Sequence, residues 1–120
     1  KAPRECSDLA VLAARFHGAI HRALELKPTT IMHLLARTDA LRKPARFEQL
    51  LMTCACDYLG RAGLENRGYP QAVHLWRALQ AANSVDGGAI AKASASPTEI
   101  QNRVQAARVN AIRSAFADAA

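Results

Sequence analysis

The stretch from Asp39 to Gln71 reads DALRKPARFEQLLMTCACDYLGRAGLENRGYPQ and contains the strongest structural signals in the chain. Pro44 suits the first position of a helix, where the amide hydrogen that proline lacks would have no partner anyway. Behind it, apolar side chains recur at the i, i+3, i+4, i+7 spacing of a helix with one buried face: Phe47, Leu50, Leu51, Cys54 and Tyr58. A glycine-rich loop follows, and Tyr69-Pro70 begins the next helix. The stretch therefore predicts two helices joined by a loop.

Upstream of this stretch, the sequence predicts two further helices. The first begins at Ser7, whose hydroxyl caps the free amides of the first turn. It ends at Lys27-Pro28, because the residue before a proline is pushed out of the helical region. Its apolar stripe consists of Leu9, Leu12, Ala13, Phe16, Ile20 and Leu24. Thr29 or Thr30 then caps a shorter helix, whose buried face consists of Ile31, Leu34, Leu35 and Thr38.

Downstream, the helix that begins at Tyr69-Pro70 has a buried face of Ala72, Leu75, Trp76, Leu79 and Ala82. Asp86-Gly87-Gly88 ends it, because glycine suits the left-handed conformation that follows a helix. After a short turn from Ala89 to Ala93, the capping box Ser96-Pro97-Thr98-Glu99 starts the last helix, which runs to about Phe116. That helix packs through Ile100, Val104, Ala107 and Ala111. No strand-like alternation occurs, so residues 1–120 are predicted to form one all-α domain, an irregular bundle of about five main helices.

The composition favours a soluble, intracellular domain with a polyanionic partner. The chain has 120 residues and a net charge of +6, and a basic balance favours polyanions. No apolar segment approaches the ~20 residues that span a bilayer, so no membrane is expected. The three cysteines, an odd number without a C-x-x-C motif, predict neither a disulfide framework nor a zinc site and favour the reducing cytoplasm. The N-terminus has neither an initiator Met nor a signal peptide, which fits a fragment of a longer polypeptide.

Basic residues lie at both ends of the helix that begins at Pro44. Phosphate recognition needs cations on loops or helix ends, where side chains and free amides converge on oxygens. The candidate RNA-binding residues are therefore Arg42, Lys43, Arg46, Arg61 and Arg67. The alternative is that these charges only form a solvated surface.

Two histidines are the candidate metal ligands. His17 and His21 stand one helical turn apart, a spacing that places two imidazoles on one metal ion. Gly18 and Ala19 lie between them in place of the acid of an H-E-x-x-H motif, so the alternative is a pair of hydrogen-bonded boundary residues. His33 and His74 have no such partner and are expected at the surface or in packing. No phosphate loop, nucleophile elbow or paired acids occur, so no catalytic residue is predicted.

The order of several motifs resembles the C-terminal half of bacterial CCA-adding enzymes, which are tRNA nucleotidyltransferases, of the multifunctional type with an HD phosphohydrolase domain. The segments that carry the resemblance are FHGAIHRALELKPTTIMHLLARTDALRKPARFEQLL, CDYLGRAGLE and YPQAVHLWRALQAANSV. They extend over nearly the whole chain, from about Ser7 to Ala115. Some members read Phe-His-Asp where this chain has Phe16-His17-Gly18. His17 matches that motif and Gly18 departs from it, which argues against phosphohydrolase activity at this position.

The resemblance implies that the family's N-terminal nucleotidyltransferase domain is missing from this chain. In the parent enzyme that domain, with Mg, CTP and ATP, would add C, C and A to the tRNA 3′ end, whereas this fragment would need no cofactor. Residues 7–38 would match the end of the HD region. Residues 39–120 would match the helical body that grips the acceptor and T arms of tRNA, with Arg42, Lys43, Arg46 and Arg61 on its basic loops.

Three hypotheses follow. The leading one is a helical, tRNA-binding, cytoplasmic part of a CCA-adding enzyme that is not catalytic by itself, with tRNA and the missing domain as partners. The second is a remnant HD-type, metal-dependent phosphohydrolase that uses His17 and His21. The third is a purely structural helical module that supports another domain. The oligomeric state is open in all three.

Overall fold

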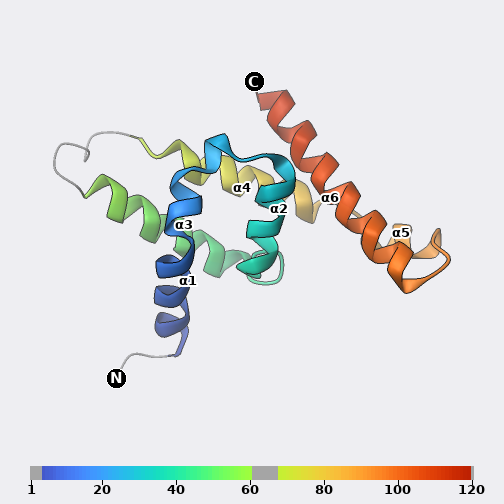
Figure 1. Cartoon of the computed structure of the whole chain (residues 1–120), viewed down its shortest axis with the longest axis horizontal. Coiled ribbons are helices and arrows are strands. Elements are labelled where there is room, and N and C mark those ends of the chain that lie inside the picture. The colour runs from blue at the N-terminus through green and yellow to red at the C-terminus, as the bar shows by residue number, and fades with distance from the viewer. Residues whose placement is uncertain (1–3, 61–67, 120) are drawn as a thin grey trace.

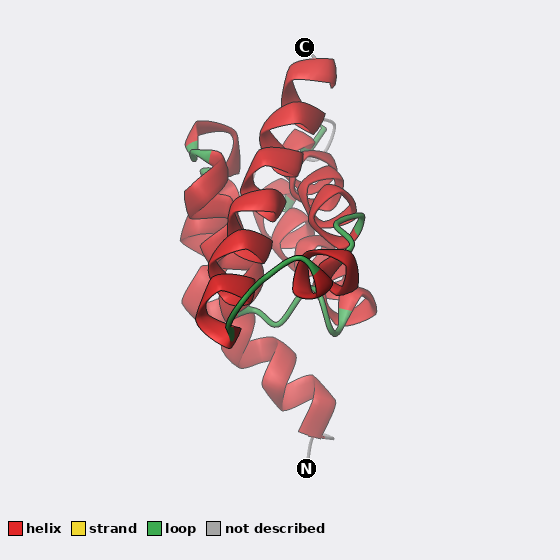
Figure 2. Ribbon diagram, turned by 90° about the vertical axis from the view of Figure 1, so that its right-hand side faces the viewer, coloured by secondary structure: helices red, strands yellow, loops and turns green. Residues whose placement is uncertain are grey.

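The computed structural model describes residues 4–60 and 68–119, and this part of the chain is helical with no strand (Figures 1 and 2). The elements are α1 (Arg4–His21), a 3-10 turn η1 (Ala23–Glu25), α2 (Pro28–Arg37), α3 (Pro44–Leu59), α4 (Pro70–Asn83), α5 (Gly87–Lys92) and α6 (Pro97–Ala119). The all-α prediction is confirmed, and the described residues form five main helices and the short α5. None of the helices in the described ranges is both long and apolar enough to cross a bilayer.

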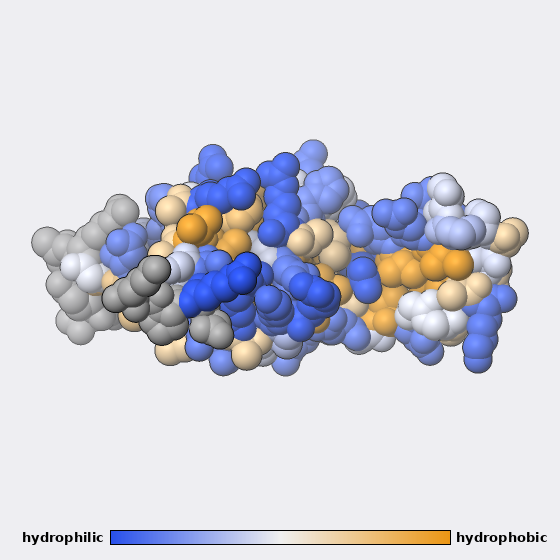
Figure 3. Space-filling model, turned by 90° about the horizontal axis from the view of Figure 1, so that it is seen from below, coloured by the Kyte–Doolittle hydropathy of each residue, from blue (hydrophilic) through white to orange (hydrophobic). Residues whose placement is uncertain are grey.

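The helices are arranged as a flattened slab. Its extents are 54 × 41 × 18 Å, and a helix with its side chains is about 10–12 Å wide, so the slab is at most two helices thick. The most extensive contacts are those of α4 with α6 and of α1 with α3. Figure 1 shows α6 running beside the end of α4, whereas the first turns of α1 project away from the other helices. In Figure 3, hydrophilic residues cover the middle of the visible face and an apolar strip lies toward the end occupied by α5 and α6.

One hydrophobic core joins the helices. The predicted face of α3 is confirmed, because Phe47, Leu50, Leu51 and Cys54 are all buried and Tyr58 packs against them at the edge. The predicted face of α2 is also buried, together with Met32, which the pattern did not include. From the other elements the core receives Phe16, Ile20, Ala23, Ala40, Tyr69, Leu75, Ala78, Leu79, Ala82 and Ile112. The core thus draws on residues from both sides of position 39.

The ends of the first helix were predicted wrongly. Helix α1 begins at Arg4, so Ser7 lies inside it and does not cap it. It ends at His21, and the chain continues through η1 before α2. A 3-10 turn has about three residues per turn in place of 3.6, which rotates the following side chains relative to the α1 stripe. As a result Ala23 is buried, whereas Leu24, predicted to lie in the core, is 53% exposed.

Two other helix ends differ from the predictions because proline and aspartate act as the local signals. Helix α2 begins at Pro28, with Lys27 in the extended conformation that a following proline requires, so Thr29 and Thr30 do not cap it. Helix α4 ends at Asn83, before the predicted stop. Asp86 caps the next helix by accepting a hydrogen bond from the amide of Ala89 at 3.0 Å. Gly87 and Gly88 therefore begin α5 and do not adopt the left-handed conformation.

Helix α6 begins at the predicted capping box. The Ser96 hydroxyl accepts from the amide of Glu99 at 3.2 Å, and the Glu99 carboxylate accepts from the amide of Ala95, one residue before the expected partner. The helix continues to Ala119, beyond the predicted end. Near that end the Phe116 ring stacks on His74 of α4, with ring centroids 3.9 Å apart. Burial, and then the charge of Arg77, lower the pKa of His74, which favours the neutral imidazole in this stack.

We expect Ile112→Ala to lower the free energy of unfolding by about 2–5 kcal/mol, because it leaves a cavity where α6 enters the core. Ile112 is fully buried. The measurement is urea unfolding followed by circular dichroism. Met52→Ala is the control: its side chain is 61% exposed, so truncating it should change the stability by less than about 0.5 kcal/mol. Equal effects of the two substitutions would contradict the placement of α6.

Candidate nucleic-acid interface

The loop between α2 and α3 closes through backbone hydrogen bonds. The amide of Ala40 donates to the carbonyl of Leu35 at 2.9 Å, and the amide of Asp39 donates to that of Ala36 at 3.1 Å. These two bonds form a Schellman motif, in which the residue after the helix cap is left-handed and is usually glycine. Here that residue is Asp39, with φ of 56°, and Ala40 behind it is fully buried. The turn therefore holds Asp39 and the basic residues after it in a defined position.

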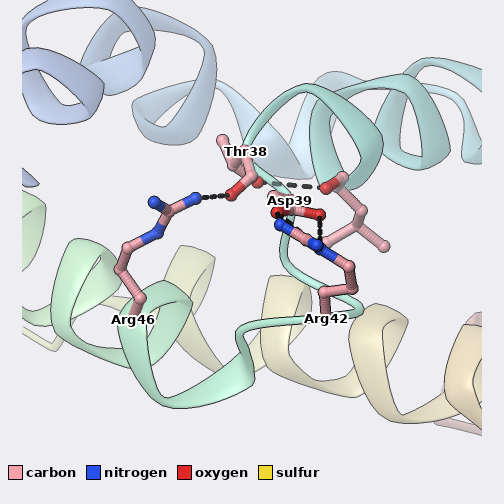
Figure 4. A network of polar contacts seen from close by, with 5 residues as sticks. Thr38, Asp39, Arg42 and Arg46 are labelled. Atoms are coloured by element: carbon pink, nitrogen blue, oxygen red, sulfur yellow. Dashed lines mark hydrogen bonds and ion pairs between the residues drawn. The ribbon is translucent and has the colours of Figure 1, made fainter. Parts of the chain in front are cut away.

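Asp39 and Arg42 form a forked ion pair at the surface (Figure 4). Nε of Arg42 donates to both carboxylate oxygens at 3.1 and 2.9 Å, and Nη2 donates to Oδ2 at 2.6 Å. These hydrogen bonds lower the pKa of the Asp39 carboxyl, so it stays ionised at neutral pH. The side chain of Arg42 is 75% exposed. Asp39 thus orients the guanidinium of Arg42 and leaves much of that group facing solvent.

Arg46 has a different role, because it bonds to the end of α2. Its Nη2 donates to the carbonyl of Thr38 at 2.7 Å, across the loop (Figure 4). Thr38 is buried, and its hydroxyl donates to the carbonyl of Leu34 at 2.9 Å. A cation at the C-terminus of a helix also complements the helix dipole. Arg46 therefore joins the first turn of α3 to the last turn of α2.

An open groove lies beside this loop, and its lining includes Asp8, Arg42, Lys43, Arg46 and Gln49. Three of these side chains are cations and one is an acid, contributed by α1. Lys43 is exposed, and its side chain forms no hydrogen bond or ion pair with the described residues. Arginine and lysine side chains bind phosphate oxygens, arginine as a fork and lysine as a point charge. The groove therefore presents cationic side chains to which an anion could bind.

The structure brings together three of the five predicted basic residues, Arg42, Lys43 and Arg46. Arg61 and Arg67 lie in the segment 61–67, outside the described residues, and remain predictions. Sequence reasoning missed Asp39 as the partner of Arg42 and Asp8 as part of the groove. The spacing of three residues between Asp39 and Arg42 was the available signal, whereas nothing in the sequence connects Asp8 to this loop.

The candidate metal ligands lie near one another but have other partners. The rings of His17 and His21 are 5.8 Å apart, edge to face. Nδ1 of His17 donates to the carbonyl of Ala13 at 3.0 Å, and Nδ1 of His21 lies 2.6 Å from the hydroxyl of Tyr69. Within residues 4–60 and 68–119, no group of three His, Cys, Asp or Glu residues is placed to hold a metal ion. The metal assignment of the two histidines stays a prediction.

His21 belongs to an aromatic cluster that connects α1, α3 and α4. Its ring centroid lies 5.3 Å from that of Tyr58 and 5.8 Å from that of Tyr69, and Gln71 donates to its carbonyl at 3.0 Å. Burial is the main cause that raises the pKa of Tyr69, so its hydroxyl keeps its proton. This cluster holds the start of α4 against the end of α1.

Comparison with known proteins decides the family. The chain is 52% identical to a multifunctional CCA protein of Nitrosomonas eutropha over 122 residues, which are 95% of this chain and 30% of that protein. It is 55% identical to the one of Cupriavidus taiwanensis over 113 residues, which are 93% of this chain and 27% of that protein. The chain belongs to the multifunctional CCA protein family.

The match covers nearly all of this chain and a minor part of its relatives. The multifunctional CCA protein of Paraburkholderia phymatum aligns over 120 residues with 49% identity, which are 99% of this chain and 29% of that protein. The chain thus spans less than a third of the length of each of these three relatives. No family model matches it, and no solved structure does. The resemblance inferred from the sequence is confirmed.

In this member of the family, we expect Arg46→Ala to lower the free energy of unfolding by about 1.5–3 kcal/mol, the usual range for a hydrogen bond from a charged donor. The substitution leaves the Thr38 carbonyl without the donor that it has in the native chain. Chemical denaturation measures the effect. Lys43→Ala, one turn away on the same loop and exposed, should change the stability by less than about 0.5 kcal/mol. If Arg46→Ala left the free energy of unfolding unchanged, the loop would be stable without this contact.

The cysteines provide a second check, because their environments differ. Burial, and then the charge of Asp57, raise the pKa of Cys54 to about 11, whereas Cys6 and Cys56 are exposed. Only the thiolate reacts with disulfide reagents. In a thiol titration of the native protein with an aromatic disulfide at neutral pH, we expect Cys6 and Cys56 to react promptly. Cys54 should react only after denaturation, and three equal rates in the native protein would contradict its burial.

Proposed function

We propose that this chain is a tRNA-binding helical part of a CCA-adding tRNA nucleotidyltransferase and that it is not catalytic by itself. The observation that carries the proposal is the match of nearly the whole chain to multifunctional CCA proteins. The net charge of +6 and the groove beside Arg42, Lys43 and Arg46 support it. On this proposal the cytoplasm is the compartment, and the remaining length of the parent protein supplies the nucleotidyltransferase domain with its Mg, CTP and ATP.

The groove supports binding to an RNA backbone more than reading of a base sequence. Proteins recognise helical RNA mainly by its shape and through phosphate and 2′-hydroxyl contacts. Lys43 and the solvent-facing part of Arg42 supply cations for phosphate oxygens. Arg46 contributes charge to the same groove, and through the Thr38 carbonyl it also fixes the distance between α2 and α3.

Asp39 moderates this binding on the same proposal. Its carboxylate occupies the Nε edge of Arg42, which leaves the opposite edge of the guanidinium for a phosphate. It also places a negative charge next to the groove, and Asp8 places another on its lining. The groove is therefore basic without being strongly attractive to every anion, which suits a surface that must release its RNA after each reaction.

We expect Arg42→Gln/Lys43→Gln to weaken tRNA binding and to flatten its salt dependence. Each lost phosphate contact reduces the slope of log K against log salt by about one, so the double substitution should reduce it by about two. The measurement is the dissociation constant for a tRNA transcript at several salt concentrations. Both side chains are exposed, so circular dichroism should remain that of the unsubstituted chain.

The matched control is Lys92→Gln/Arg113→Gln, which removes the same charge from exposed positions on α5 and α6. It should change the salt slope by much less than the groove variant. Equal losses in the two variants would indicate binding through net charge alone and would reject the groove as the tRNA contact. Unchanged tRNA affinity in the groove variant would reject it as well.

A further inference from the structure

A second groove lies between the end of α1 and one face of α2, and its lining is basic without any acid. It has a volume of about 320 Å³. Arg22, which follows the last residue of α1, and His33 and Arg37 of α2 supply its charged or titratable side chains. Sites for small molecules begin at about 300 Å³, so the space is large enough for one. We call this the α1–α2 groove.

Helical spacing explains why these side chains meet. Thr30, His33, Leu34 and Arg37 follow one another at i, i+3, i+4 and i+7, so they share one face of α2. The opposite face of the helix is buried in the core through Ile31 and Leu35. The polar side of α2 is thereby fixed toward the end of α1. The positions of Arg22 and Arg37 at the rim of the groove therefore do not depend on a mobile surface loop.

The donors of the α1–α2 groove are free, in contrast to those beside the α2–α3 loop. There, Arg42 is bonded to Asp39 and Arg46 to Thr38. Here, the side chains of Arg22, His33 and Arg37 form no hydrogen bond or ion pair with any of the described residues. The hydroxyl of Thr30 lines the groove and likewise donates to none of them. Two free guanidinium groups in a groove without an acid are a strong attraction for a phosphate.

The floor of the groove is apolar and aromatic. It is formed partly by Phe16 and Leu34, whose side chains are nearly buried in the core beneath. The guanidinium carbon of Arg15 lies 5.5 Å from the centroid of the Phe16 ring and adds a cation near the same floor. A phosphate alone uses the arginine rim and leaves this floor uncovered. A ligand that joins a phosphate to a flat ring uses both.

We propose that the α1–α2 groove binds a nucleotide, with its phosphate between Arg22 and Arg37 and its base or ribose against the apolar floor. The hydroxyl of Thr30 and the imidazole of His33 are donors for the remaining oxygens, since imidazole donates in either protonation state. The nucleotide is either a free nucleoside monophosphate or one unit of an RNA strand. The chemistry recognised is the same in both cases, and the inference does not depend on the groove of Arg42 and Lys43.

The test is a titration of the 120-residue chain with adenosine 5′-monophosphate, inorganic phosphate and adenosine, followed by amide chemical shifts in NMR spectra. We expect the monophosphate to bind about tenfold more tightly than either half alone, because only it uses rim and floor together. The largest shifts should fall on Thr30, His33 and their neighbours. Equal affinities for the monophosphate and inorganic phosphate would overturn the nucleotide assignment.

Arg22→Gln/Arg37→Gln should lower the affinity for the monophosphate by about tenfold or more, because charge-assisted hydrogen bonds to phosphate are among the stronger hydrogen bonds. Both positions are exposed, so the fold is expected to persist and thermal unfolding checks it. Lys92→Gln/Arg113→Gln removes equal charge elsewhere and should leave the affinity within about twofold. An unchanged affinity in the groove variant, or an equal loss in the control, would overturn the proposal.

A competition experiment distinguishes the two sources of the nucleotide. A short single-stranded RNA that displaces the monophosphate from the unsubstituted chain, and that binds Arg22→Gln/Arg37→Gln more weakly than the unsubstituted chain, identifies an RNA strand as the ligand. Monophosphate binding without displacement by RNA identifies a free nucleotide. No monophosphate binding at any concentration up to the solubility limit overturns both. None of these results depends on whether Arg42→Gln/Lys43→Gln affects tRNA binding.

Discussion

The hydrogen bond from Arg46 to the carbonyl of Thr38 is the contact on which the arrangement around the α2–α3 loop depends. It satisfies the carbonyl at the end of α2, and the Schellman motif satisfies the neighbouring carbonyls. With both in place, Asp39 is held in the left-handed conformation and Ala40 enters the core. The direction in which α3 leaves the loop is thereby set, and with it the positions of Arg42 and Lys43.

The two grooves show that arginine side chains of the same chain serve different purposes. Arg42 and Arg46 are joined to neighbouring groups, so their charge is partly used in building the loop. Arg22 and Arg37 have no such use among the described residues. An arginine bound to a protein carboxylate or carbonyl must share its donors with a ligand, whereas a free one offers its whole fork. The arginines of the groove beside the α2–α3 loop therefore serve more to stabilise the loop, whereas those of the α1–α2 groove have more donors available for an anion.

Periodicity predicted the helices and most of the core, since Phe47, Leu50 and Ile31 occupy the buried faces that their spacing assigned. The prediction for Leu24 was wrong, because a short 3-10 turn changes the angle per residue and no pattern in the sequence predicts such a turn. The grouping of Arg42, Lys43 and Arg46 followed from their nearness in the sequence. The hydrogen bond from Arg46 to Thr38 could not be predicted from the sequence, because it depends on Asp39 adopting a conformation that glycine usually takes. The sequence predicted no role for Arg22 and Arg37, because each, taken alone, resembles an ordinary solvated charge.

The flatness of the slab has a thermodynamic consequence. The Cα radius of gyration is 15.8 Å, whereas a compact domain of this length has one of about 13.6 Å. The exposed area of 7602 Å² exceeds by roughly a fifth the value of about 6,300 Å² expected for this mass. Less area is removed from water per residue, so the folded state has less hydrophobic stabilisation to set against chain entropy. Any molecule that binds the folded chain and covers a face of the slab then adds to its stability by mass action.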